Sequence, residues 1–149
     1  MNIAIKVDTS KFDKMLAAFP EAIARAHRVA LHQIGNTVKN RTTYAFKKEE
    51  LRPSPWAPRK HSKRDDGHAL LRRSTDMFRS IDYFVQEPDT VVIGTKVDYA
   101  KYHQFGTKNM PARPFFPLDA NGNLLPDINQ KIMKKIENAF TAELKKFGR

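Results

Sequence analysis

Residues 81–95 read IDYFVQEPDTVVIGT, and this stretch decides the fold. Two runs rich in β-branched and aromatic residues, 81–86 and 90–95, flank a turn at 87–89 that contains Glu, Pro and Asp. Runs of this composition favour β-strands, and a turn this short joins antiparallel neighbours. The stretch therefore predicts a β-hairpin.

Three smaller elements are predicted from local patterns. Residues 2–7 alternate between apolar and other side chains, which is typical of a half-buried strand. Residues 10–19 combine a capping pattern with apolar residues on one side, which indicates a short helix. A second short helix is expected within 70–80, with Ser74 or Thr75 as its N-terminal cap.

Two long helices are predicted from their periodicity. Between residues 21 and 46 there is no proline, and apolar residues recur at spacings of three and four. From Asp127 onward the spacing is four residues, with basic residues at the helix end, where the helix dipole favours cations. The apolar positions of this second helix are Ile128, Ile132, Ile136, Phe140 and Leu144.

The hairpin and helices together define an α+β fold. Residues 97–105 are rich in aromatic side chains, and 111–118 carry three prolines and two phenylalanines, so both are expected as further extended chain. The predicted architecture is an antiparallel sheet packed by a long N-terminal helix and a C-terminal helix, with a long basic, proline-rich loop. The 149-residue length suits a single domain. Its expected parts are 1–46, 47–69, 70–118 and 119–149.

The loop 47–69 contains three prolines, almost no aliphatic residues and the only tryptophan, Trp56. This composition predicts no regular secondary structure. Trp56 either anchors the loop to the body of the protein or lies exposed in an interface, and anchoring is the favoured interpretation.

The formal net charge of +11 is concentrated in two segments. Residues 39–73 carry +7 and residues 131–149 carry +4, whereas 74–130 carry −2. Such a distribution indicates contact with phosphate or with an acidic protein surface, and the alternative is a solvated, flexible basic loop. The basic docking candidates are Lys47, Lys48, Arg52, Arg59, Lys60, Lys63, Arg64, Arg72 and Arg73.

Several classes of protein are excluded or disfavoured. The chain has no cysteine, which excludes disulfides, cysteine-ligated zinc, iron–sulfur clusters and thiol catalysis. No run of 18 apolar residues is present, so no membrane partner is expected. The N-terminus does not resemble a signal peptide.

The histidines do not form a convincing catalytic or metal site. His61 and His68 lie with Asp65 and Asp66 in the basic loop, where no rigid scaffold orients metal ligands. His103 lies among aromatic residues and is expected to be a packed, hydrogen-bonded histidine. We therefore expect no catalytic residues, no cofactor and no metal, and the chain is predicted not to be an enzyme.

The segment 111–117, which reads PARPFFP, is the most unusual stretch. It is expected either to cover the core as a strap or to dock on the next subunit, and the two interpretations are equally supported. Arg113 is placed where it could pair with a carboxylate or a phosphate.

Several motifs together resemble one protein family. They are SPWAP at 54–58, LRRSTDMFRSI at 71–81, VIGT at 92–95, YAKYHQFG at 99–106 and PARPF at 111–115. In this order and spacing they resemble the phage virion morphogenesis family, the tail-completion proteins of contractile-tailed and Mu-like phages and prophages. The resemblance covers roughly residues 20–118. One departure is Thr75-Asp76, where family members commonly have a glycine after the serine.

The resemblance implies a structural protein of the head–tail neck or upper tail. It implies an α+β subunit that assembles as a ring, often a hexamer, and no catalytic residue. Segments 99–106 and 111–117 are then determinants of fold or assembly. The candidate interface residues are Trp56, Tyr99, Tyr102, His103, Phe105, Arg113, Phe115 and Phe116.

The expected function is therefore tail completion or head–tail joining, through ring formation and docking of the tail to the head. Expected partners are other copies of the chain, the tail tube or tail terminator, head connector proteins and DNA in the lumen. The expected location is the virion, after assembly in the cytoplasm of the bacterial host. The alternative is a nucleic-acid-binding module that uses residues 39–73, with Tyr44, Phe46 and Trp56 interleaved among the bases. A third hypothesis is an enzyme that uses His61, His68 or His103.

Overall fold

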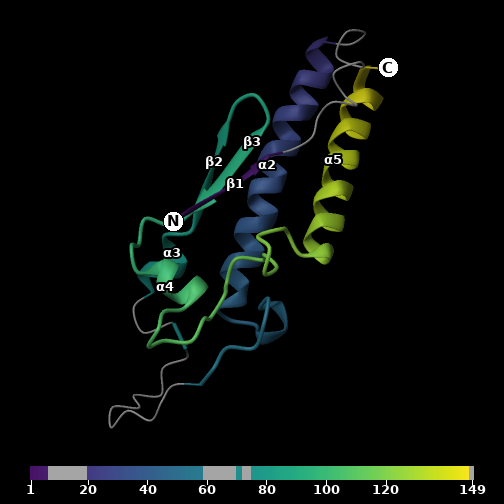
Figure 1. Cartoon of the computed structure of the whole chain (residues 1–149). Helices are drawn as coiled ribbons and strands as arrows, with labels where there is room; N and C mark the ends of the chain where they lie inside the picture. The colour runs from purple at the N-terminus through teal and green to yellow at the C-terminus, as the bar shows by residue number, and fades with distance from the viewer. Residues whose placement is uncertain (7–19, 59–69, 72–74, 148–149) are drawn as a thin grey trace.

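The structure of this chain, a computed structural model, describes residues 1–6, 20–58, 70–71 and 75–147 (Figure 1). The short helix expected within 10–19 lies outside these residues, as does Ser74.

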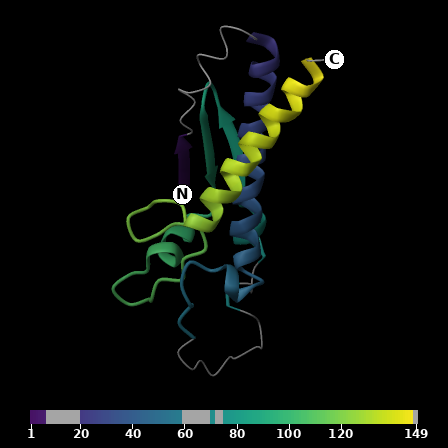
Figure 2. The same cartoon turned by 90° about the vertical axis from the view of Figure 1, so that its right-hand side faces the viewer.

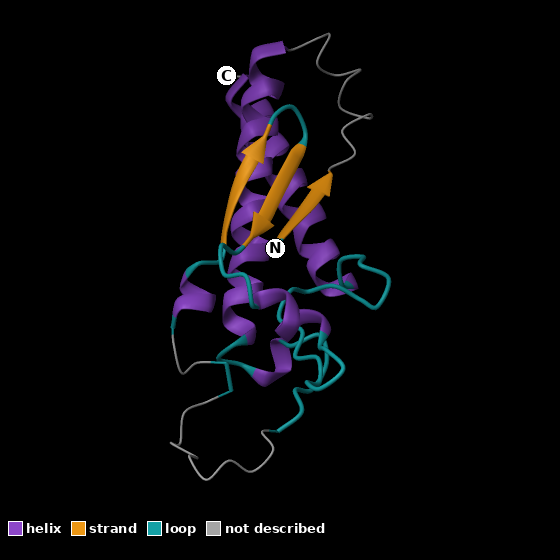
Figure 3. Ribbon diagram, turned by 60° about the vertical axis from the view of Figure 1, so that its left-hand side comes forward, coloured by secondary structure: helices purple, strands orange, loops and turns teal. Residues whose placement is uncertain are grey.

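Three antiparallel strands form the sheet, in the order β1-β3-β2 (Figure 3). They are β1 (Asn2–Lys6), β2 (Asp82–Gln86) and β3 (Thr90–Gly94). The predicted hairpin and the predicted N-terminal strand are both confirmed. The central position of β3 agrees with its composition, because β3 buries almost every residue while β1 and β2 alternate.

Helix α2 (Pro20–Ala45) lies between the sheet and helix α5 (Pro126–Phe147). It contacts β2 and β3 on one side and α5 on the other, and α5 makes its most extensive contact with α2 (Figures 1 and 2). A surface helix buries one stripe of residues, but α2 packs on two sides and therefore buries residues around more of its circumference. The predicted α+β fold, with both long helices, is confirmed.

Gly35 explains how closely α2 approaches the sheet. A Cβ atom at this position would lie 2.2 Å from Cδ2 of Tyr83, a residue of β2. The tyrosine ring therefore packs directly on the helix backbone, and only glycine leaves room for it.

Three local predictions need correction. The loop after α2 contains a short 3₁₀ helix, η1 (Glu49–Leu51), and the Arg41 guanidinium donates to the carbonyl oxygen of Leu51. Residues within 97–105 form helix α4 (Ala100–Phe105) instead of extended chain. Helix α3 (Asp76–Arg79) is present as predicted, but Thr75 makes no capping hydrogen bond with its side chain.

The helical conformation of α4 follows from where its small and polar residues lie. Ala100 and Gln104, four residues apart, form its buried side. Gly106 ends the helix with a φ of 75°, and a Cβ there would lie 2.8 Å from the amide nitrogen of Ala112. Aromatic residues in this segment favoured extended chain in the sequence, whereas tertiary packing selects the helix.

Candidate assembly surface

The strap, residues 111–117, is extended and turns its phenylalanines into the core. Phe115 is 0% exposed and Phe116 is 1% exposed. Their backbone N–H groups both donate to Oε1 of Gln104, over 3.0 Å and 3.1 Å. Because the strap joins no sheet, this single amide oxygen satisfies two buried donors that would otherwise be unpaired. The core-covering interpretation of the strap is confirmed within the chain.

Trp56 anchors the loop after α2, as favoured from the sequence. Its side chain is 7% exposed, and Nε1 donates to the carbonyl oxygen of Pro114 over 2.7 Å. Phe46 packs edge-on against its ring, with centroids 5.7 Å apart. The Arg52 guanidinium lies 4.0 Å from the ring centroid, so a cation–π contact covers the indole.

Arg113 also joins the strap to this loop. Nε donates to the carbonyl oxygen of Ala57 over 2.9 Å, and Nη2 donates to that of Pro58 over 3.2 Å. The side chain is buried. Four of the interface candidates therefore lie inside the chain's own packing and hold the fold together: Trp56, Arg113, Phe115 and Phe116.

The other aromatic candidates lie on the outside of α4. We call Tyr99, Tyr102 and Phe105 the α4 patch; they are 42%, 47% and 69% exposed. Nζ of Lys101 lies 5.2 Å from the centroid of Tyr102. Single exposed apolar residues are common, whereas several large ones around one short helix make this face a candidate interaction surface.

His103 lies between the α4 patch and the strap. Its ring meets that of Tyr99 edge-on, with centroids 5.9 Å apart, and its carbonyl oxygen accepts from the Arg113 N–H over 2.6 Å. Nδ1 is buried and finds no hydrogen-bond partner among the described residues. Burial, and then the charge of Arg113, holds the pKa of His103 below its usual range. The packed position agrees with the expectation for His103, but the hydrogen bond expected of its ring is missing at Nδ1 within the described residues.

The basic docking candidates divide into three groups. Lys47 and Lys48 are exposed at the end of α2. Arg52 is used within the chain, where it also donates to the Ala45 carbonyl oxygen and pairs with Glu49 over 2.8 Å. The remaining candidates lie outside the described residues, together with His61 and His68: Arg59, Lys60, Lys63, Arg64, Arg72 and Arg73.

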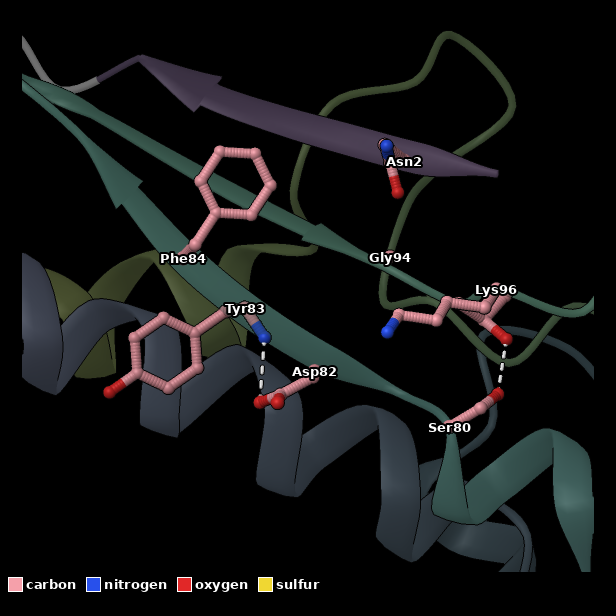
Figure 4. A pocket seen from close by; sticks show the side chains of 8 residues that line it. Asn2, Ser80, Asp82, Tyr83, Phe84, Gly94 and Lys96 are labelled. Carbon is pink, nitrogen blue, oxygen red and sulfur yellow. Dashed lines mark hydrogen bonds between the residues drawn. The ribbon is translucent and has the colours of Figure 1, made fainter.

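The sheet carries a further exposed surface that the sequence reasoning missed. Phe84 is 56% exposed on the face opposite α2, whereas its neighbour Tyr83 points toward the helix (Figure 4). A shallow pocket of about 320 Å³ lies beside Phe84, at the end of the sheet where Asn2, Asp82 and Lys96 gather. The two-residue period of a strand carried the signal, because it places Phe84 on the face opposite Tyr83 and Val85.

Asp82 lines this pocket and makes two polar contacts. Its carboxylate pairs with Nζ of Lys39 in α2 over 2.9 Å and accepts from the Tyr83 N–H over 2.9 Å. These hydrogen bonds hold the pKa of Asp82 below its ordinary value. The ion pair is a surface contact between β2 and α2. No group of three or more metal-ligating side chains occurs among residues 1–6, 20–58, 70–71 and 75–147.

The comparisons with known proteins now give the class of the chain. The model of the phage virion morphogenesis family matches residues 7–145, and the chain belongs to this family. The predicted resemblance is thereby confirmed, and membership indicates a structural or assembly role in the phage virion. No curated protein and no solved structure matches the chain. Across the part of the chain that the structure describes, no helix is long and apolar enough to cross a membrane.

Proposed function

We propose that this protein completes the phage tail, or joins the tail to the head, as a ring of identical copies in the neck of the virion. Its partners would be neighbouring copies, the tail tube or tail terminator, and the head connector. It would act through geometry and docking, without catalysis. Family membership supports the assembly role, and the α4 patch is the observation that carries the docking role.

The α4 patch suits contact with another protein for two reasons. Its three aromatic side chains are held on a helix whose inner side is fixed by Gln104 and the strap. The patch is therefore presented by a rigid support, which lowers the entropy cost of binding. Aromatic residues of this kind dominate the energetics of protein interfaces.

The test is the mass of the protein alone and with isolated tail tubes. Wild-type protein is expected to form a closed oligomer, at least on the tail tube. The double variant Tyr102→Ala/Phe105→Ala should lose about tenfold or more of its binding, because each anchor contributes on the order of 1–2 kcal/mol. Met133→Ala is the matched control, since Met133 is 60% exposed on α5. Equal binding by wild type and double variant would reject a docking role for the patch.

The basic segment supports a second contact, with an acidic partner ring or with DNA in the lumen. Deleting residues 50–68 is a poor test, because it removes the buried anchor Trp56. Charge removal is sharper: Arg59, Lys60, Lys63 and Arg64 are changed to Gln, and the control changes Lys131, Lys134, Lys135 and Lys145 of α5. The loop variant should lose virion assembly while the α5 variant keeps it, and full infectivity of the loop variant would contradict the role.

The alternative nucleic-acid-binding module loses part of its support. Phe46 and Trp56 are buried, so neither ring is available to stack on bases, whereas Tyr44 remains exposed. A gel-shift titration across salt decides this alternative. Retardation that falls steeply with salt would support it, and no retardation at low ionic strength rejects it.

A further inference from the structure

We propose that the sheet continues from copy to copy: edge strand β2 of one copy pairs in parallel with edge strand β1 of the next, with Phe84 beside Ala4 of the neighbour. The inference rests on the proposed ring and specifies the contact that builds it. The occupant of each edge is therefore a second copy of this chain.

Both ends of the sheet are suited to pairing. Within the described residues, β1 and β2 each form a ladder with β3 alone, so each has one side that pairs with no described strand (Figure 3). Exposed edges of this kind act as templates for another strand. The usual protections are weak here, since neither strand contains proline and their charged residues, Lys6 and Asp82, stand at strand ends.

The direction of pairing follows from the topology. Both edge strands are antiparallel to β3, so they are parallel to each other. A rotation about an axis that runs along the strands keeps their direction, and it brings β2 of one copy beside β1 of the next in parallel. Two different edges that meet in this way give a heterologous contact, and such a contact forms a ring when the rotation from copy to copy closes. Pairing of β2 with β2 gives only a two-fold dimer.

The register of the sheet supplies the side-chain match. Phe84 and Ala4 both stand level with Val92 on the outer face, through their pairings with β3. When the next copy continues at the same level, the large, 56%-exposed Phe84 meets the small Ala4. A large side chain beside a small one fills space without overlap, and the contact covers Phe84.

The remaining positions are compatible with the same register. Asp82 would stand beside Asn2 of the neighbour and Gln86 beside Lys6, so no like charges meet. On the inner face the half-buried Tyr83 and Val85 continue into Ile3 and Ile5, which also pack on the core. The apolar inner face would thus run uninterrupted from copy to copy.

The absence of cysteine makes a direct test available. In the double variant Ala4→Cys/Phe84→Cys, the two thiols of one copy are separated by β3, at about 9.5 Å between their strands. A disulfide needs Cα atoms closer than about 7 Å, so it forms only between copies. Each copy then carries one thiol for each neighbour, and mild oxidation links the ring step by step.

The expected result, on a non-reducing gel of oxidised protein with tail tubes, is a ladder of dimers, trimers and larger products. The single variants Ala4→Cys and Phe84→Cys should give essentially monomer. The register control Ala4→Cys/Gln86→Cys should cross-link at least several-fold less. The pair Lys6→Cys/Gln86→Cys tests the same register two residues further along the strands, since both residues stand level with Thr90. It tests the proposed pairing if the first double variant does not fold.

The other outcomes overturn the inference in distinguishable ways. Strong dimers from Phe84→Cys alone would show that β2 pairs with β2. Oligomers by native mass without any cross-linked ladder would show that the ring forms through another surface, which leaves the proposed function standing. Wild-type protein that stays monomeric with and without tail tubes would remove the ring itself, and with it this contact.

Discussion

The strap and helix α4 are both aromatic, lie only a few residues apart, and treat their aromatic side chains in opposite ways. Phe115 and Phe116 are fully buried, whereas Phe105 is the most exposed large apolar residue among the described ones. The difference comes from the backbone. The extended strap is hydrogen-bonded to Gln104 and packs on the core. In helix α4 the buried side is formed by Ala100 and Gln104, so the aromatic rings lie on the exposed side. Aromatic content alone therefore does not separate the parts that hold the fold from those that meet a partner.

The largest effect is expected from truncating matched phenylalanines on the two sides of this comparison. Phe115→Ala should lower the free energy of unfolding by about 3–5 kcal/mol, because it leaves a cavity in the core. Phe105→Ala should change it by less than about 0.5 kcal/mol, because the ring is mostly in solvent. Denaturant unfolding followed by circular dichroism measures both. Equal losses would break the distinction between the two segments.

The next largest effect on stability is expected from removing the shared hydrogen-bond acceptor, Oε1 of Gln104. Gln104→Leu keeps the volume but leaves the N–H groups of Phe115 and Phe116 buried without a partner. At about 1–3 kcal/mol for each unsatisfied group, a loss of about 2–6 kcal/mol is expected in the same unfolding experiment. Lys101→Leu, one turn away on the exposed side of α4, is the control and should be nearly neutral. A neutral Gln104→Leu would mean that the strap does not depend on α4.

A smaller effect is expected at the joint between the strap and the loop. Arg113→Lys cannot reproduce the two hydrogen bonds to the carbonyl oxygens of Ala57 and Pro58, and it should cost about 1–2 kcal/mol. Trp56, the single tryptophan, reports the change directly, since loosening of this joint should shift its emission to longer wavelength. Arg79→Lys, at an exposed position of α3, is the control. An unshifted spectrum of Arg113→Lys would speak against the joint.

The smallest effect is expected in how the melting temperature depends on pH, through His103. The pKa of His103 is held below its usual range in the folded state by burial and by Arg113. In the unfolded chain a histidine takes up a proton near pH 6.5, roughly. The unfolded state therefore binds more protons on acidification, and the melting temperature should fall as the pH drops through this range. His103→Gln should show a weaker dependence between about pH 7 and pH 5. A variant with the wild-type dependence would show that other groups cause it.

Much of the fold could be predicted because strong periodicity agrees with the final packing. The hairpin follows from the β-favouring composition of 81–86 and 90–95 around a short turn, and both long helices follow from three- and four-residue spacings. Helix α4 could not be predicted, since β-favouring aromatic residues in 97–105 are overruled by the inward packing of Ala100 and Gln104.

The candidate surface could be predicted only in part. Proline on both sides made Trp56 recognisable as an anchor, but an extended strap normally alternates its side chains. That both Phe115 and Phe116 are buried depends on the amide of Gln104, a contact that spacing does not reveal. The exposure of Phe84 could be predicted from the two-residue period of its strand. Its position at a sheet edge could not, because the strand order β1-β3-β2 is set by tertiary structure.

The pairing of β1 with β3 also sets an order of events during synthesis. Asn2 stands opposite Gly94, so β1 must wait until about 90 further residues have been made before its partner exists. At about 5–20 residues per second, the delay is roughly 5–20 s. Until then the two edges do not belong to one sheet. A nascent chain therefore cannot present the pair of matched edges that the proposed ring would use until β3 has been made and has paired with both edge strands.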